Sequence, residues 1–475
     1  MNNKLIHALI TCCLLFTLSS CEEDPKLSDN LVEFEAEVAG ISADEETLTI
    51  NINLSREVSS DATLTLSLEG SGVEYGTDFT TDPASVANVI SVTIPEGETQ
   101  GLIILSKVEG ALFDGNESVT LTLTDAEGKL VIGTKSQIIV SFSEIIVSTA
   151  TMDIQGGGPT YPNKVFIDLS ANRQTAIDRT TWDFGFSSST DFRVILNSSN
   201  GMMARAIDKT DLNAVTAADT VGFGAQLSLS AVFAAIITDP TPDWVPTAIT
   251  WIDDPTGDLT NTAIASVSAT DTENKVYIVN KGDGPGTPAT ELGWKKIRIV
   301  RNGTGYTLQH ADINATTFSE IQITKDTEFA FQYVSMATGS VDVEPATARW
   351  DIAWTGFTNS TDFGSGPVPY YFQDIILQNK NGVETAELLI ANVGEYADFD
   401  GADLTGLIFD TSQINIGSKW RSGGGPGGGP SLKTDRFYVI KDADGNVYKL
   451  KFTALTQNGE RGKPAIEFAL LQEGE

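Results

Sequence analysis

The sequence predicts an all-β protein in which an N-terminal sandwich precedes a larger antiparallel β domain. Apolar and polar residues alternate with period two in segments such as 48–54, 62–68 and 118–123, as they do in strands with one buried face. Helical periodicity is weak and is confined to residues 209–219 and 225–237. Strands joined by turns are therefore expected to account for most of the chain.

Composition bounds the size, the surface and the partners of the protein. The chain has 475 residues, of which 41% are hydrophobic, and this is enough for several cores. With 64 acidic and 30 basic residues the formal net charge is -34. Such a surface repels nucleic acid and anionic membrane, so we exclude both as direct electrostatic partners. The charge is spread along the chain, and solubility alone is a sufficient explanation for it.

The N-terminus carries the pattern of a bacterial lipoprotein signal. Lys4 precedes an apolar stretch, 5–18, which has the length of a signal-peptide core and is too short to span a bilayer. The tetrapeptide Leu-Ser-Ser-Cys that ends at Cys21 is a lipobox. We therefore predict a signal peptide at 1–20, lipidation of Cys21 and a lipidated tether at 21–30.

Three acidic residues directly after Cys21 resemble the export signal that sends some lipoproteins to the outer face of the outer membrane. This pattern predicts a protein that is anchored by lipid in the outer membrane and faces the exterior. An acidic tether that only keeps the linker solvated is the alternative.

The counts of cysteine and histidine limit the chemistry. All three cysteines lie at or before position 21, so the mature chain has no disulfide, no thiolate nucleophile and no cysteine-based metal site. Only His310 of the two histidines lies in the mature chain, so a Ser-His-Asp triad would depend on that residue. We predict that the protein is not an enzyme. A paired-carboxylate glycosidase is left open, because its carboxylates can come from anywhere in the chain.

Residues 31–146 are predicted to form a β-sandwich of about seven short strands separated by turn residues. Within this segment the runs 75–79, 94–99 and 114–121 resemble the Calx-β module in their order and spacing. The resemblance covers the whole segment and implies a sandwich of that type.

Some Calx-β modules bind calcium through acidic residues at one end of the sandwich. Asp78, Asp114 and Glu117 stand at the acidic positions of the family, and the resemblance implies a calcium site at these residues. The acidic run that usually closes the module is missing at 141–144. A spacer without calcium is the alternative.

Two segments further along the chain, 182–186 and 350–354, share a pattern. Each begins with Trp-Asp, places large residues at alternate positions, and precedes polar residues typical of turns. Related strands about 170 residues apart predict an internal repeat of one β architecture. Two ordinary core strands of similar composition are the alternative.

The larger domain is predicted to occupy residues 147–475. Hairpins are expected to turn at 302–303 and 444–446, where Asn, Asp and Gly occur. The Gly-rich run 423–430 lacks the Lys-Ser/Thr ending of a phosphate loop, so we expect a flexible loop there. Strands are expected at 164–169, 192–197, 275–279, 295–300, 306–310, 328–334, 437–441 and 447–452.

Four stretches of this domain, 182–212, 344–353, 416–420 and 437–452, resemble the HmuY family of haem-binding surface lipoproteins. The likeness covers most of 150–472. It implies an all-β fold, a haem pocket, and handover of haem to a TonB-dependent receptor in the outer membrane.

Haem iron takes His, Met, Cys or Tyr ligands, and the resemblance implies a pair of His or of Met residues. A His pair is excluded by counting, because only His310 is present in the mature chain. The first candidates are Met202 and Met203, which follow a turn signal at 200–201, and Met336 and His310 are further candidates. Core packing is the alternative for the methionines, and a surface position is the alternative for His310.

Tyr370 and Tyr371 are candidates to stack on a porphyrin, with core packing as the alternative. Together these features predict a surface-anchored lipoprotein that binds haem or a related porphyrin and delivers it to an outer-membrane receptor. The alternative function is a surface binding module for a glycan or a protein ligand on the same scaffold.

Overall fold

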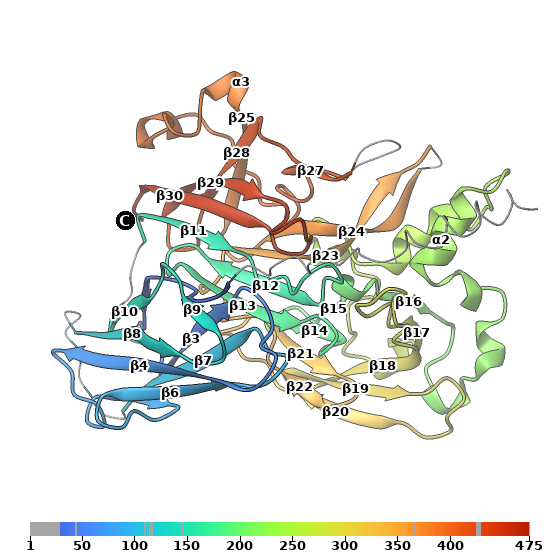
Figure 1. The fold of residues 1–475 in the computed structure, drawn as a ribbon. Coiled ribbons are helices and arrows are strands. Elements are labelled where there is room, and N and C mark those ends of the chain that lie inside the picture. Colours follow the sequence, from blue (N-terminus) through green and yellow to red (C-terminus); the bar gives the residue numbers. More distant parts are fainter. Residues whose placement is uncertain are drawn as a thin grey trace, which may run out of the picture. The chain divides into compact units, whose positions relative to one another are not determined.

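The computed structural model describes the chain from residue 29 to residue 474 with short gaps (Figure 1). The predicted signal peptide, the lipidation site Cys21 and the calcium candidate Asp114 lie outside the described residues. The chain divides into two compact units, of which the first comprises Met1–Glu37 and Ala43–Ser143 and the second Val38–Ser42 and Glu144–Glu475. The described ranges are 29–42, 45–108, 111, 113, 117–143, 147–364, 366–423 and 429–474.

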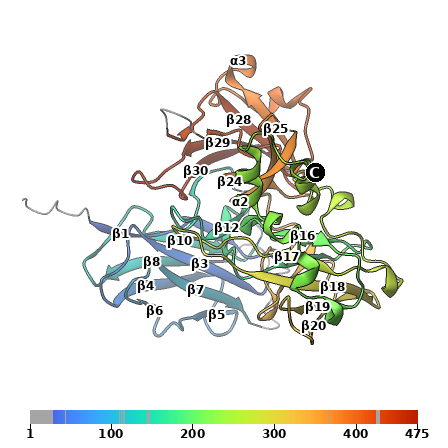
Figure 2. The same cartoon turned by 90° about the vertical axis from the view of Figure 1, so that its right-hand side faces the viewer.

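The first unit contains a five-stranded sheet in the order β5-β7-β3-β1-β9 and a second sheet in which β10-β8-β4-β6 are consecutive (Figure 2). The alternating apolar residues predicted from the sequence point into the core, as the strict alternation of buried and half-buried positions in β4 shows. β2 (Val38–Gly40) is assigned to the second unit. The strands of the first unit are β1 (Asn30–Phe34), β3 (Thr47–Leu54), β4 (Ala62–Ser71), β5 (Phe79–Asp82), β6 (Val89–Ile94), β7 (Gln100–Lys107), β8 (Ser118–Ala126), β9 (Leu130–Ile132) and β10 (Gln137–Ser141).

The second unit is built almost entirely from strands, so the prediction of an all-β protein in two parts is confirmed. Its strands are β11 (Thr149–Asp153), β12 (Asn163–Asp168), β13 (Arg173–Asp178), β14 (Phe184–Ser187), β15 (Val194–Leu196), β16 (Met203–Ala206), β17 (Tyr277–Asn280), β18 (Trp294–Asn302), β19 (Gly305–Ala311), β20 (Ser319–Ile323), β21 (Phe331–Ser335), β22 (Gly339–Val341), β23 (Ile352–Asp362), β24 (Pro367–Gln378), β25 (Glu384–Leu389), β26 (Arg421–Ser422), β27 (Ser431–Leu432), β28 (Arg436–Lys441), β29 (Val447–Ala454) and β30 (Ala465–Gln472).

Helices are few and short in the described part of this unit. The predicted helical segment 225–237 contains α2 (Leu229–Ile236). The predicted segment 209–219 instead contains two separate 3-10 turns, and the side chains of Asp211 and Thr216 accept backbone N–H groups at the start of each one. The others are α3 (Ile390–Val393), η1 (Ser198–Asn200), η2 (Leu212–Ala214), η3 (Ala217–Thr220), η4 (Gly224–Gln226), η5 (Val245–Trp251), η6 (Leu259–Asn261), η7 (Asp271–Glu273) and η8 (Gly401–Leu404).

Four sheets of the second unit reveal the internal repeat. Two four-stranded sheets have the orders β13-β12-β23-β24 and β22-β21-β14-β15, and two five-stranded sheets have the orders β11-β30-β29-β28-β25 and β20-β19-β18-β17-β16. The strands β11 to β19 thus correspond one to one with β20 to β25 followed by β28 to β30. Each sheet takes strands from both halves, so the repeat forms one interleaved domain.

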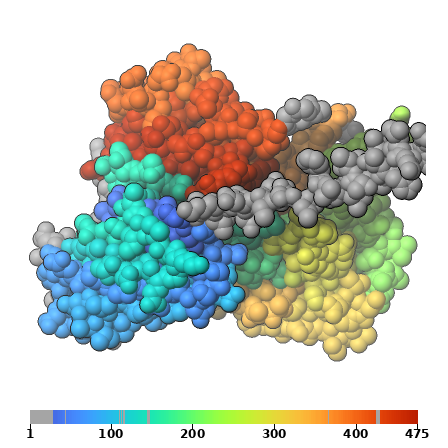
Figure 3. Space-filling view, in the orientation of Figure 1, coloured from blue at the N-terminus to red at the C-terminus, as the bar shows by residue number. Residues whose placement is uncertain are grey.

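The exchange is clearest at the first strand of each half. β11, from the start of the unit, pairs with β30 at its end, and the blue-green and red strands lie side by side (Figure 1). In the space-filling view the blue-green atoms of this region adjoin the red atoms of the last strand (Figure 3). β20 likewise completes the sheet of the other half by pairing with β19. Neither half can therefore form its five-stranded sheet alone.

The two Trp-Asp segments make the same hydrogen bonds. The N–H of Asp183 donates to the carbonyl oxygen of Val334 at 2.8 Å, and its carboxylate accepts the N–H two residues further along that strand at 2.7 Å. The N–H of Asp351 donates to the carbonyl oxygen of Ile167 at 2.8 Å, and its carboxylate accepts the N–H two residues further along at 2.8 Å. Each aspartate therefore makes the same two hydrogen bonds to the backbone at the end of the neighbouring strand.

A buried asparagine repeats beside each of these segments. The Asn197 amide donates to the carbonyl oxygen of Trp182 at 2.8 Å, and the Asn379 amide donates to that of Trp350 at 2.9 Å. Each amide also donates, at 2.7 Å, to the carbonyl oxygen three residues before its tryptophan. The prediction of an internal repeat is therefore confirmed at the level of individual hydrogen bonds.

The two tryptophans share one core cluster. The ring of Trp182 meets Tyr333 edge-on at a centroid distance of 4.9 Å, and the ring of Trp350 meets Phe166 edge-on at 5.1 Å. Tyr333 and Phe166 occupy equivalent positions, each one residue before the carbonyl that receives the aspartate N–H. Both copies thus bring their aromatic residues to the place where the halves meet.

Candidate ligand-binding cavity

A cavity of about 450 Å³ opens in the second unit, and this volume is in the range of small-molecule sites. Its wall combines aromatic rings with hydroxyl, carboxylate and ammonium groups. The lining residues are Lys164, Trp182, Ser187, Ser188, Ser189, Ile195, Leu196, Ser198, Ser199, Asp253, Asp254, Gly257, Asp258, Leu259, Thr262, Thr327, Phe329, Ala330, Phe331, Thr347, Phe357, Leu377, Lys380, Asn381 and Gln413.

The cavity lies where the two halves of the repeat meet. The same strand registers occur in both halves, so a residue in one half can be matched to an equivalent residue in the other. Several such pairs line the cavity with both of their members, so the two halves contribute equivalent parts of the wall. The pairs are Lys164 with Phe331, Ser189 with Phe357, Ile195 with Leu377, Ser198 with Lys380, and Ser199 with Asn381.

One part of the wall is cationic and aromatic. Lys164 lies on β12, and its ammonium is 4.7 Å from the ring centroid of Phe166 and 5.8 Å from that of Trp182. Burial lowers the pKa of Lys164 to about 8, and the negative charge of Glu344 offsets part of this effect. Glu344 is buried too and accepts a hydrogen bond from the Tyr333 hydroxyl at 2.7 Å.

The segment 252–262 supplies carboxylates to the wall. Burial raises the pKa of Asp253 to about 7, although its oxygens accept the backbone N–H groups of Leu196 at 2.6 Å and Ala263 at 3.0 Å. A neighbouring cavity of about 360 Å³ is also lined by Asp253 and Asp254. The two cavities therefore adjoin at this segment.

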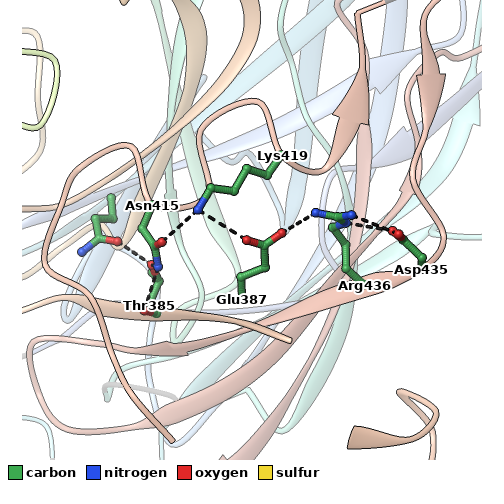
Figure 4. Close-up of polar contacts among 7 residues, drawn as sticks. Thr385, Glu387, Asn415, Lys419, Asp435 and Arg436 are labelled. Atoms are coloured by element: carbon green, nitrogen blue, oxygen red, sulfur yellow. Dashed lines mark hydrogen bonds and ion pairs between the residues drawn. The ribbon is translucent and has the colours of Figure 1, made fainter. Parts of the chain in front are cut away.

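A polar network holds the loop that carries Gln413 into the wall (Figure 4). On this loop the Asn415 amide donates to the Thr385 hydroxyl at 2.9 Å, and the Lys419 ammonium donates to the Asn415 side chain at 3.2 Å. Lys419 also pairs with Glu387 of β25 at 3.4 Å, and Glu387 pairs in turn with Arg436 of β28. Backbone and side-chain bonds thus fix the loop against a sheet edge.

The candidate methionine ligands lie in the hydrophobic core. Met202 and Met336 are 1% and 8% exposed and belong to the same core cluster, whereas Met203 is fully buried in a second cluster. The turn predicted before them is present, with Gly201 in the left-handed conformation at φ 74°. No methionine is among the described residues that line the cavity. This placement favours core packing, and their role as iron ligands stays a prediction.

His310 is half-buried on β19 and is not among the residues that line the cavity. Burial lowers the pKa of His310, the nearby charge of Lys295 lowers it further, and Asp183 and Asp312 act in the opposite direction. Its role as a ligand is also untested.

The two tyrosines differ in their surroundings. The Tyr371 hydroxyl donates to the carbonyl oxygen of Ser199 in the cavity wall at 2.8 Å, and burial raises its pKa. Tyr370 joins an aromatic group with Phe233, Phe363 and Phe372, at centroid distances of 5.0–5.8 Å. The structure thus brings Tyr371 close to the cavity wall and Tyr370 to a separate aromatic surface.

Two of the calcium candidates are described. The Asp78 carboxylate accepts the backbone N–H of Glu74 at 2.8 Å, and Glu117 lies directly before β8. Over the described ranges, no three His, Cys, Asp or Glu side chains gather as a metal site. Because Asp114 lies outside those ranges, calcium binding stays a prediction.

Several wall residues were not predicted as site residues. Lys164 directly precedes the apolar run Val-Phe-Ile, and the sequence gives no further sign that it lines a cavity. Ser188 and Asp253 carry no local signal, because their place in the wall depends on pairing between the two halves.

The chain matches the model of a known protein family. The HmuY family, described as HmuY protein, matches residues 160–468, which is well over half of the chain. No curated protein matches the chain. Among the residues that the structure describes, no helix combines the length and apolar character needed to cross a bilayer.

Solved structures show weak likeness. An apo-form Calx CBD1 domain is 13% identical, covers 24% of this chain and 97% of its own, and has a TM-score of 0.21. A two-domain protein of unknown function from Bacteroides fragilis is 10% identical, covers 46% and 78%, and scores 0.18. A putative carbohydrate binding protein from Bacteroides ovatus is 11% identical, covers 94% and 99%, and scores 0.17.

Proposed function

We propose that this chain, which belongs to the HmuY family, binds a porphyrin-class ligand in the cavity between the two halves of its repeat domain. The observation that carries the proposal is the aromatic wall. Trp182, Phe329, Phe331 and Phe357 line one cavity of small-molecule size. Flat apolar rings suit such a wall through stacking and edge contacts.

The wall fits the ring of haem better than its iron. Iron ligation needs His, Met, Cys or Tyr, and none of these residue types is among the described residues of the wall. Met202 and Met336 would have to leave the core cluster in which they are buried. We therefore propose that the ring is held by apolar contacts, so haem and metal-free porphyrin are both ligands.

The cellular setting extends the proposal. The lipobox at Cys21 supports anchoring by lipid in the outer membrane, and the acidic residues after it support exposure to the exterior. The family resemblance supports delivery of the ligand to a TonB-dependent receptor. In this role the domain binds and releases its ligand and performs no catalysis.

A titration tests the proposal. Protein lacking residues 1–21 is titrated separately with haemin and with protoporphyrin IX. We expect saturable one-to-one binding of both with similar affinity, and a haemin spectrum without the low-spin form that two strong axial ligands produce. Absence of binding for both compounds would overturn the proposal. Binding of haemin alone, in a low-spin form lost on Met202→Ala, would replace it with iron ligation.

One observation favours a glycan as a second candidate ligand. Phe233 and Phe363 are 44% and 52% exposed, and with Tyr370 they form an aromatic surface at α2 and the hairpin of β23 and β24. Exposed apolar patches of this kind mark interaction sites. Binding on a glycan array that is lost on Phe363→Ala would support this candidate, whereas an array without signal would remove it.

A further inference from the structure

We infer that Lys164, Trp182 and Ser188 form a recognition site for a carboxylate carried by the apolar ligand of the cavity. The inference rests on the proposed function in that it uses the same cavity, and it adds which group of the ligand is recognised. All three residues line the cavity.

Two hydrogen-bond donors of this group lack an acceptor, and the ammonium of the half-buried Lys164 has no ion-pair partner, among the described residues. The indole Nε1 of Trp182 and the hydroxyl of Ser188 are buried without a hydrogen-bond partner, in side chains that belong to residues 3% and 5% exposed. Within the described ranges, no carboxylate comes within the 4.0 Å of an ion pair with the Lys164 ammonium. Buried donors normally have partners, so a group of orphaned donors on one cavity wall indicates a ligand acceptor.

The charge of the group selects an anion. Lys164 is cationic below its pKa of about 8, and it faces aromatic rings rather than a paired carboxylate. Its acidic neighbour, Glu344, accepts the Tyr333 hydroxyl with one oxygen and keeps the other buried without a partner among the described residues, and burial raises the pKa of this carboxyl group, so its negative charge is weakened. A carboxylate supplies two acceptor oxygens and the missing negative charge, and bonds between charged groups are the stronger ones.

The acidic part of the wall orients the ligand. Asp253, Asp254 and Asp258 lie on the segment 252–262. Asp254 and Asp258 accept backbone N–H groups within this segment, and Asp253 accepts the N–H of Leu196. A second carboxylate of the ligand would be repelled at this segment. The carboxylate end of a ligand is therefore directed toward Lys164.

Paired probes test the inference without depending on porphyrin binding. Fluorescence titrations compare 1-pyrenebutyrate with its neutral amide, and protoporphyrin IX with its dimethyl ester. Each pair keeps the aromatic body and removes the charge. For wild-type protein at pH 7 we expect each acid to bind roughly 10-fold or more tightly than its neutral partner.

Two variants remove donors and keep the shape of the wall. Lys164→Met retains an unbranched apolar side chain against Phe166, and Trp182→Phe retains a ring without the N–H. We expect both to reduce the ratio of acid affinity to amide affinity toward one, whatever change each variant causes in the binding of the amide itself. Lys451→Met is the matched control, because Lys451 also lies over a ring, that of Tyr396, but on β29 away from the cavity wall.

The outcomes separate this inference from the proposed function. Equal binding of acid and amide, no binding of either pyrene probe, or a preference that survives both variants would overturn the inference. Porphyrin binding in those cases would leave the proposed function intact. Acid preference with the pyrene pair and no binding of either porphyrin would support the carboxylate site and overturn the proposed ligand.

Discussion

At the cavity, burial shifts the pKa values of individual side chains so that their neutral forms are favoured. It lowers the pKa of Lys164 to about 8 and raises that of Asp253 to about 7. Both groups therefore change charge near physiological pH, unlike the exposed carboxylates that dominate the surface. Under the proposed function, their charges are expected to influence which ligands bind, because charge interactions are stronger in a cavity than in bulk water.

Asp253 gives a testable pH dependence of stability. Its ordinary pKa is 3.8 and its folded value is about 7, so between these values the folded state holds a proton that the unfolded state has lost. The stabilising contribution is complete below about pH 4 and is lost as the pH rises through 7. Between pH 4 and pH 8, we expect the free energy of unfolding of the wild-type protein to fall by roughly 2–4 kcal/mol more than that of Asp253→Ala. Urea unfolding of both proteins from pH 4 to pH 8 measures it, and parallel curves would contradict the assignment.

Met202 provides a second test at this scale. Its side chain is 1% exposed in a core cluster, so Met202→Ala is expected to lower the free energy of unfolding by about 2–5 kcal/mol through the cavity it leaves. We expect the absorption spectrum of bound haemin to stay unchanged. A spectral change without loss of stability would identify Met202 as a ligand to iron.

For individual residues, the sequence predicted a local turn correctly, but it did not predict which distant strands surround a side chain. The turn at Asn200-Gly201 was predicted and is present. Whether Met202 faces a pocket or a core was not predictable, because that depends on strands from β14 to β21 that lie far away in the chain. The place of Lys164 in the cavity wall was not predictable for the same reason, because alternation along one strand does not show which residues cover each face.

At the scale of strands, the repeat is the main organising feature. Two Trp-Asp segments indicated it in the sequence, and equivalent hydrogen bonds of Asn197 and Asn379 support it in the structure. The exchange of β11 and β20 between the halves was not predictable. Strand pairing over such distances depends on tertiary packing, which leaves no local pattern.

The repeat predicts equal energetic roles for the two asparagines. Asn197→Ala and Asn379→Ala each remove two hydrogen bonds to buried carbonyl oxygens. We expect each variant to lose about 2–4 kcal/mol of unfolding free energy in denaturant titrations. Asn302→Ala, at an exposed hairpin turn, is the control and should lose less than about 0.5 kcal/mol. A loss confined to one of the two copies would contradict their equivalence.

At the scale of the whole molecule, the chain consists of two units with separate cores. The sandwich and the repeat domain were both predicted from strand patterns. The nine described strands of the first unit exceed the seven or so expected because short strands such as β9 (Leu130–Ile132) carry no clear alternation. The ligand cavity belongs entirely to the second unit. Ligand binding should therefore not require the first unit.

A fragment tests this independence. We expect residues 147–475, expressed alone, to unfold cooperatively and to bind protoporphyrin IX with the dissociation constant of the longer protein. Circular dichroism and fluorescence titration measure the two properties. A fragment that fails to fold, or that folds and binds at least tenfold more weakly, would show that the first unit contributes to the site.

The most direct test of the central claim is to fill the cavity from each half of the repeat. Ile195 and Leu377 are equivalent wall positions, so Ile195→Trp and Leu377→Trp place a bulky ring in the same space from the two sides. With Ile139→Trp on an exposed strand of the first unit as the control, protoporphyrin IX affinity is measured by absorbance. We predict at least a tenfold loss for both cavity variants, with folding retained, and none for the control. Unchanged affinity in both folded cavity variants would contradict the claim that the ligand binds between the two halves.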